Sequence, residues 1–134
     1  MKRALVTSTL IGTLLLCGCV TTPRTEAALV GTNWTVEDIS GRGVIDDARA
    51  TLVFGADGRL SGDTSCNRYF ADYKVAGVKL SIGQAGVTRR ACVPAVMDQE
   101  RRFLDVLNAV DTFAIDASGA LVLHTPAGAT LTAR

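Results

Sequence analysis

The segment ATLVFGADGRL, residues 50–60, decides the class of the fold. Apolar side chains at Ala50, Leu52 and Phe54 alternate with their neighbours, and the pattern resumes at Leu60 after an Asp-Gly pair. A period of two is typical of a half-buried strand, and Asp-Gly between two such runs is typical of a tight hairpin turn. The segment therefore predicts an antiparallel hairpin, and with it a sheet whose neighbouring strands run in opposite directions.

The same alternation recurs before and after this hairpin, in short runs separated by turns that contain glycine. The apolar positions of these runs are Trp34, Val36, Tyr73, Val75, Leu80, Ile82, Phe113, Ile115, Leu121, Leu123 and Leu131. Short strands joined by such turns are typical of a meander. We expect a curved antiparallel β-sheet that is partly barrel-like.

One segment departs from the strand pattern and predicts an α-helix over about residues 94–110. At about 100° per residue, Phe103, Leu107 and Val110 fall on one stripe with Glu100. A carboxylate on an apolar stripe must be paired, hydrogen-bonded or protonated, because burying it alone is costly. Glu100 is either a perturbed acid in a cleft or a polar clamp that fixes the helix to a loop, and we favour the clamp. The expected fold class is α+β, with the sheet packed around this single helix.

The N-terminus has the anatomy of a bacterial lipoprotein signal peptide. Lys2 and Arg3 precede an apolar run, residues 4–16, which leads into the sequence LCGC that ends at Cys19. The run is too short for a transmembrane helix, which needs about 20 apolar residues. In such signals a small residue precedes the cysteine at which the signal peptide is cut. Gly18 precedes Cys19, whereas the bulky Leu16 precedes Cys17, so we expect lipidation at Cys19 rather than at Cys17. An ordinary signal peptide of a soluble periplasmic protein is the alternative.

These features predict three parts: a signal peptide over residues 1–18, a lipid-anchored tether over residues 19–30 and a folded domain over residues 31–134. Acyl chains of the palmitate class on Cys19 would make the membrane a partner, since multiple chains anchor a protein stably. Val20 follows the cysteine, where aspartate is the usual signal for retention in the inner membrane. We therefore expect the outer membrane of the bacterial envelope, with the domain facing the periplasm.

The charge balance argues against nucleic acid as a partner. The chain has 14 basic and 13 acidic residues, and losing Lys2 and Arg3 with the signal peptide leaves 12 basic residues. No basic stripe remains, and the sequence contains neither a glycine-rich phosphate loop nor a Ser-His-Asp arrangement with a second histidine to spare. We assign no catalytic residue and expect no cofactor.

After cleavage and lipidation, Cys66 and Cys92 are the remaining thiols, in an oxidising compartment. A disulfide between them would close a loop of about 27 residues and contribute roughly 3 kcal/mol through loop-closure entropy. The alternatives are a metal site with His124, or a nucleophilic cysteine with that histidine as its base. Two cysteines and one histidine match no zinc motif, so we expect a disulfide and no metal ion.

Three motifs follow one another along the chain: GDTSCNRYF at residues 62–70, TRRAC at residues 88–92, and a helix that carries Glu100 and Phe103. Together they resemble the META domain of HslJ-like bacterial lipoproteins, over most of residues 31–134. The resemblance implies an α+β fold and an association with heat shock or envelope stress. It implies no reaction.

The match has three departures from the family pattern. Ser65 and Ala71 stand where glycine is common in the family, and Arg90 stands where methionine is typical. The order and spacing of the three motifs are unchanged by these departures.

The motif residues also have structural roles that require no enzymatic function. Asn67, next to the expected disulfide, can bond its own backbone in a tight loop. Thr88 offers a hydroxyl and Tyr69 a phenol near the same loop. We expect Asn67, Thr88 and Glu100 to form one hydrogen-bonded polar cluster, with Tyr69 beside it, that ties loop, strand and helix together.

Three classes of function remain. The first is a non-catalytic outer-membrane lipoprotein that supports envelope integrity or a stress response through contact with an unidentified envelope protein. The alternative is a periplasmic module that binds a small apolar ligand or drug inside the curved sheet. The third is a hydrolase built on Glu100, which lacks a recognisable second carboxylate or an activated nucleophile. We expect the first class and no enzyme.

Overall fold

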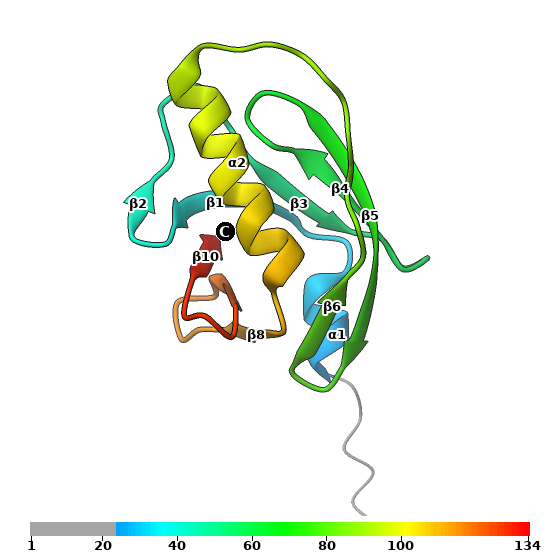
Figure 1. Ribbon diagram of the computed structural model, residues 1–134. Coiled ribbons are helices and arrows are strands. Elements are labelled where there is room, and N and C mark those ends of the chain that lie inside the picture. Colours follow the sequence, from blue (N-terminus) through cyan, green and yellow to red (C-terminus); the bar gives the residue numbers. More distant parts are fainter. Residues whose placement is uncertain (1–23) are drawn as a thin grey trace, which may run out of the picture.

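The computed structural model describes residues 24–134, so the expected signal peptide and Cys19 lie outside the described residues. Two helices and ten strands make up the described chain (Figure 1). In chain order they are α1 Arg24–Leu29, β1 Asn33–Ile39, β2 Arg42–Gly43, β3 Thr51–Phe54, β4 Arg59–Asp63, β5 Arg68–Ala76, β6 Lys79–Ile82, β7 Gly86–Val87, α2 Pro94–Ala109, β8 Thr112–Ile115, β9 Leu121–His124 and β10 Thr130–Ala133.

Eight strands close into an antiparallel barrel. Strands β1, β3, β4, β5, β6, β8, β9 and β10 pair in that order, and β10 pairs back with β1. The closing register places Val36 opposite Ala133 and Ile39 opposite Leu131. The expected meander is present, but the sheet is closed rather than only partly barrel-like. Closure removes the two edges that an open sheet would expose.

The hairpin predicted from residues 50–60 is confirmed. Val53 pairs with Ser61 and Phe54 with Leu60 in the ladder between β3 and β4. Gly58 in the connecting turn has a φ of 79°, in the left-handed region that a glycine adopts without strain. The Asp-Gly pair therefore forms the turn that its chemistry predicts.

The helix expected over residues 94–110 is confirmed as α2, which contacts β1, β6 and β10. Figure 1 shows it lying between the C-terminal strand β10 and the β4–β5–β6 side of the barrel. Phe103 and Leu107 are fully buried, and the ring of Phe103 lies 5.3 Å from that of Tyr69 on β5. The helix thus packs its apolar stripe onto the barrel and helps to fill it.

Large side chains fill the interior of the barrel. Those that are almost completely inaccessible are Leu29, Ile39, Leu52, Phe54, Leu60, Leu80, Phe103, Leu107, Phe113, Leu121, Leu123 and Leu131. Most of them stand at the alternating apolar positions of the sequence, so the strand pattern correctly identifies the inward face. A core packed in this way leaves little room for a guest molecule.

The sheet packs with one long helix, as expected, and part of the predicted tether forms a second, short helix, α1, of six residues. Leu29 at its end is fully buried, and the indole nitrogen of Trp34 donates a hydrogen bond to the Leu29 carbonyl over 3.2 Å. Val30 then forms a parallel bridge with Phe54. These contacts make the described part of the segment a packed element of the domain. Among residues 24–134, neither helix has the length and apolarity needed to cross a bilayer.

Candidate functional site

Asn67 is the centre of a polar cluster that joins three elements. Its side-chain nitrogen donates to both carboxylate oxygens of Glu100, over 3.1 and 3.0 Å. Its side-chain oxygen accepts bonds from the Thr88 hydroxyl over 2.9 Å and from the Arg90 backbone N–H over 2.7 Å. One amide therefore ties the loop between β4 and β5, the segment after β7, and α2 together.

Glu100 is partly buried and held by neutral donors. Besides Asn67, the hydroxyl of Thr64 donates to it. Thr64 is completely buried and also donates to the backbone oxygen of Asn67 over 2.9 Å. Within residues 24–134 no basic side chain forms an ion pair with Glu100. This geometry supports the clamp interpretation over the perturbed acid in a cleft.

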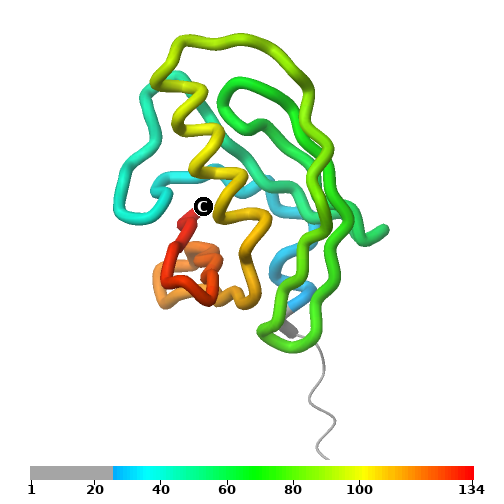
Figure 2. The backbone as a smooth tube through the Cα atoms, viewed as in Figure 1, coloured from blue at the N-terminus to red at the C-terminus, as the bar shows by residue number. Residues whose placement is uncertain are grey.

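The disulfide between Cys66 and Cys92 is confirmed, with the two Cα atoms 5.9 Å apart. Figure 2 shows the chain between β7 and α2 arching over the loop between β4 and β5, and the bridge fastens these two segments. Since both sulfur atoms are bonded to each other, neither serves as a thiolate ligand or nucleophile with His124. In the described part of the chain, no three His, Cys, Asp or Glu side chains are placed to hold a metal ion.

Tyr69 does not join the polar cluster. Its phenol donates instead to the backbone oxygen of Thr51 on β3, over 2.9 Å. Burial, with a smaller contribution from the charge of Asp63, raises the pKa of Tyr69 above its ordinary value. Tyr69 lies inside β5 with its ring packed against Phe103 in the core, whereas Asn67 belongs to the loop before the strand, where its side chain meets Arg90 and Glu100.

Gln99 is a site residue that sequence reasoning missed. Its side chain is completely buried, accepts a bond from the Ile45 backbone N–H over 2.8 Å, and donates to the Ala48 carbonyl over 2.8 Å and the Ser65 hydroxyl over 2.7 Å. It stands four residues before Phe103 on the buried stripe of α2, and this spacing is the signal that could have identified it. Gln99 and Glu100 together anchor the first half of α2 to two loops.

A groove of about 570 Å³ runs between α2 and the segment that contains β7. We call it the β7–α2 groove. Its walls and floor are formed by Asn67, Ala85, Val87, Thr88, Arg89, Arg90, Ala91, Met97, Glu100 and Leu104. Members of the polar cluster thus line this groove together with apolar side chains of α2 and of the β7 segment.

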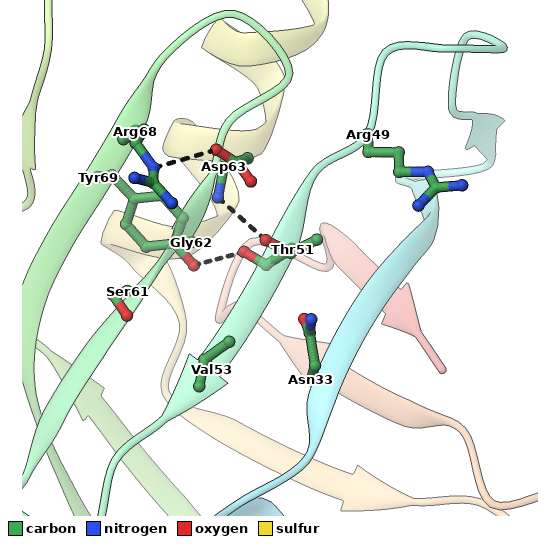
Figure 3. Close-up of a pocket in the computed structure, with 9 residues that line it drawn as sticks. All are labelled: Asn33, Arg49, Thr51, Val53, Ser61, Gly62, Asp63, Arg68 and Tyr69. Atoms are coloured by element: carbon green, nitrogen blue, oxygen red, sulfur yellow. Dashed lines mark hydrogen bonds and ion pairs between the residues drawn. The ribbon is translucent and has the colours of Figure 1, made fainter.

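A second pocket, of about 550 Å³, lies on the side of the barrel formed by β1, β3, β4 and β5 (Figure 3). Some of its polar groups bond to one another: the hydroxyl of Thr51 accepts the Asp63 backbone N–H over 3.0 Å, and Asp63 lies 3.6 Å from Arg68. A Cβ at Gly62 would lie 2.2 Å from the Thr51 backbone oxygen, so only glycine lets the strands approach here. We interpret this pocket as a structural seam between β3 and β4.

The geometry offers no catalytic constellation in the described residues. The hydroxyl that bonds Glu100 belongs to Thr64, which is completely buried and cannot reach a substrate. A nucleophile must be accessible and must be bonded to a base that a third group orients. The cluster can hold elements in place and can form the floor of a binding groove.

Comparisons with known proteins agree with this architecture. The family model described as the META domain matches residues 27–134. A protein from Burkholderia xenovorans solved by NMR is 25% identical, with a TM-score of 0.68 and coverage of 99% of this chain and 97% of that chain. No curated protein matches the chain.

Two further structures are similar in fold alone. One, solved by NMR, is 24% identical, with a TM-score of 0.68, and the match covers 82% of this chain and 93% of that chain. The other is a crystal structure of a DUF4847 family protein from Bacteroides vulgatus, which is 15% identical with a TM-score of 0.61, covering 81% of this chain and 94% of that chain.

Proposed function

The chain belongs to the META domain family, and from this premise we propose that it is a non-catalytic binding module of the bacterial envelope that works through contact with another protein. The proposal includes attachment to the outer membrane through lipidated Cys19, with the domain facing the periplasm in a stress-related role. The lipoprotein pattern at residues 16–19 supports the attachment, and the motifs shared with the family support the role.

The filled barrel is the observation that carries this proposal. Phe54, Phe103 and Phe113 are almost completely buried inside it, so a ligand could enter the barrel only by displacing core side chains. Binding surfaces therefore lie outside the barrel. Met97 on α2 is 44% exposed at the β7–α2 groove, and Val93 is 65% exposed just before the helix. Exposed apolar side chains beside a groove are typical of protein contact sites.

A small apolar ligand remains a second candidate because of one further pocket. It measures about 300 Å³, at the lower limit of ordinary ligand sites, and lies between the second half of α2 and the turn before β10. Val106, Ala109, Ala127 and Ala129 give it a mostly apolar lining. Saturable binding of a hydrophobic dye that Ala109→Trp abolishes would favour this candidate.

The contact function is tested by photo-crosslinking in intact cells. A photoreactive amino acid replaces Met97 in the full-length protein, and the matched control carries it at Ser118, which is exposed in the turn between β8 and β9. We expect a discrete crosslink to another protein from position 97 and none from position 118. Equal crosslinking from both positions, or none from either, contradicts the proposal.

A further inference from the structure

We propose that the β7–α2 groove takes up an extended peptide segment of a partner protein, which adds as a strand to the free edge of β7 and carries acidic side chains toward Arg89 and Arg90. This inference rests on the proposed contact function and names the class of partner. It is carried by the strand register, by the walls of the groove and by its charges.

The edge of β7 is free on the side of the groove. Strand β7, Gly86–Val87, pairs with β5 alone, and the Thr88 backbone N–H bonds to the Arg68 carbonyl over 3.0 Å. Backbone groups of successive residues in a strand point to opposite sides, so those of Val87 point away from β5. Among residues 24–134 no group bonds them, and Val87 lines the groove. An added strand would supply the missing partners.

The groove also offers an apolar wall opposite this edge. Met97 and Leu104 of α2 both line the groove; Met97 is 44% exposed, while Leu104 packs against the core. Since side chains of a strand alternate in direction, every second residue of the peptide would face this wall. We therefore expect apolar residues at alternate positions of the bound segment.

The free charges of the groove select an acidic segment. Arg89 and Arg90 are exposed, and neither forms an ion pair within the described chain. The one carboxylate of the groove, Glu100, already accepts bonds from Thr64 and Asn67. Two unpaired guanidinium groups at the rim attract carboxylates of a partner and repel lysines.

The test measures binding of a fluorescent octapeptide to the full-length protein in detergent micelles by anisotropy. The peptide alternates valine and threonine and ends in two aspartates; its matched control ends in two lysines. We expect saturable binding of the aspartate peptide and at least tenfold weaker binding of the lysine peptide. Equal binding of both peptides, or no binding of either, overturns the proposal.

Two variants locate the site. Val87→Pro removes the N–H that faces the groove and leaves the bonds to β5 intact, and proline is tolerated on such an edge. The double variant Arg89→Glu, Arg90→Glu keeps the backbone and reverses the charge, so it serves if Val87→Pro does not fold. Each is expected to weaken binding of the aspartate peptide at least tenfold. Unchanged binding in a folded variant overturns the assignment of the edge or of the arginines, respectively.

The peptide-binding experiment and the crosslinking experiment can fail independently of each other. A specific crosslink from position 97 in cells without peptide binding at Val87 would retain the contact function and reject strand addition. Peptide binding without any crosslink in cells would support the groove chemistry and reject its use as a contact in the envelope.

Discussion

Ser65 occupies a backbone conformation that favours glycine, with a φ of 92°. A non-glycine residue in a sparsely populated region costs of order 1–3 kcal/mol, and it persists only where its surroundings compensate. The compensation here is the bond that its hydroxyl accepts from Gln99 over 2.7 Å. Ser65 therefore carries backbone strain that glycine would avoid, and in return its hydroxyl bonds Gln99 on α2.

Replacing Ser65 tests this exchange. Ser65→Gly relieves the strain and loses the bond, so we expect the free energy of unfolding to stay within about 1 kcal/mol of the original. Ser65→Ala keeps the strain and loses the bond, and should lower it by about 1–2 kcal/mol. Urea unfolding of both variants decides, and equal destabilisation by glycine and alanine would count against the argument.

Glu100→Ala tests the polar clamp. The change removes the carboxylate that accepts from the Asn67 amide and from the buried Thr64 hydroxyl, so we expect the free energy of unfolding to fall by about 2–4 kcal/mol. Asp105→Ala, on the exposed side of α2, is the control and should stay within about 0.5 kcal/mol. Chemical denaturation measures both. A midpoint that is unchanged or higher in Glu100→Ala would move Glu100 from the clamp to a binding role.

At the scale of elements, the disulfide fixes the segment from which α2 begins. Reduction frees a loop of about 27 residues, and loss of a native bridge in a small secreted domain costs typically 2–5 kcal/mol. We expect a drop of that size in the free energy of unfolding for the Cys66→Ala, Cys92→Ala double variant. Mass spectrometry after thiol alkylation checks that Cys66 and Cys92 are bridged in the original protein. Two freely alkylated cysteines in that protein would refute the bridge.

The turn between β8 and β9 is held by Asp116. A hydrogen bond from the Ser118 side chain, followed by backbone bonds from Ala120 and Ser118, lowers the pKa of Asp116 from its ordinary 3.8. A carboxyl whose pKa is lower in the folded state stabilises fully above its unfolded pKa, and this contribution is lost as pH falls through the folded pKa.

Asp116→Asn removes the charge while keeping an acceptor oxygen in the turn. We expect the variant to be slightly less stable than the original protein at pH 7 and the difference to shrink as the pH falls through the lowered pKa of Asp116. Thermal melts across this range measure it, with Asp105→Asn as an exposed control. A difference that persists unchanged at the acid end would assign the effect to packing rather than charge.

Among the elements, those that span at least two periods of their own pattern were predictable, two residues for a strand and about 3.6 for a helix, and α1 was not. Alternation identified the inward residues of β3 and β4, and helical spacing identified α2, because each pattern extends over several turns or pleats. α1 has six residues, too few for a period to emerge. Gln99 was overlooked because a polar side chain on a buried stripe satisfies its bonds with loops that are remote in sequence.

At the scale of the whole molecule, closure of the barrel depends on a pairing between the first and the last strand. Alternation in β1 and β10 indicates that each has a buried face, but it says nothing about which strands are neighbours. The polar cluster was predictable as a group because its residues belong to family motifs. The place of Tyr69 was not, because the carbonyl that its phenol bonds belongs to Thr51, on a strand remote in sequence.

The proposed attachment to the membrane also concerns the whole molecule, and a substitution of Cys19 tests it. We expect Cys19→Ser to accumulate as an unprocessed or soluble species, while Cys17→Ser is processed normally. Metabolic labelling with a fatty acid and membrane fractionation measure the difference. Normal lipidation of the Cys19→Ser protein would refute this site of attachment.

The seam between β1 and β10 also constrains when the chain can fold. Thr35 and Arg134 exchange backbone hydrogen bonds in both directions, so the pairing with β1 continues one residue beyond β10. Because a polypeptide is synthesised from its N-terminus, β1 is made long before β10. The barrel therefore cannot close before β10 has been synthesised, after the seven strands that it joins into a ring.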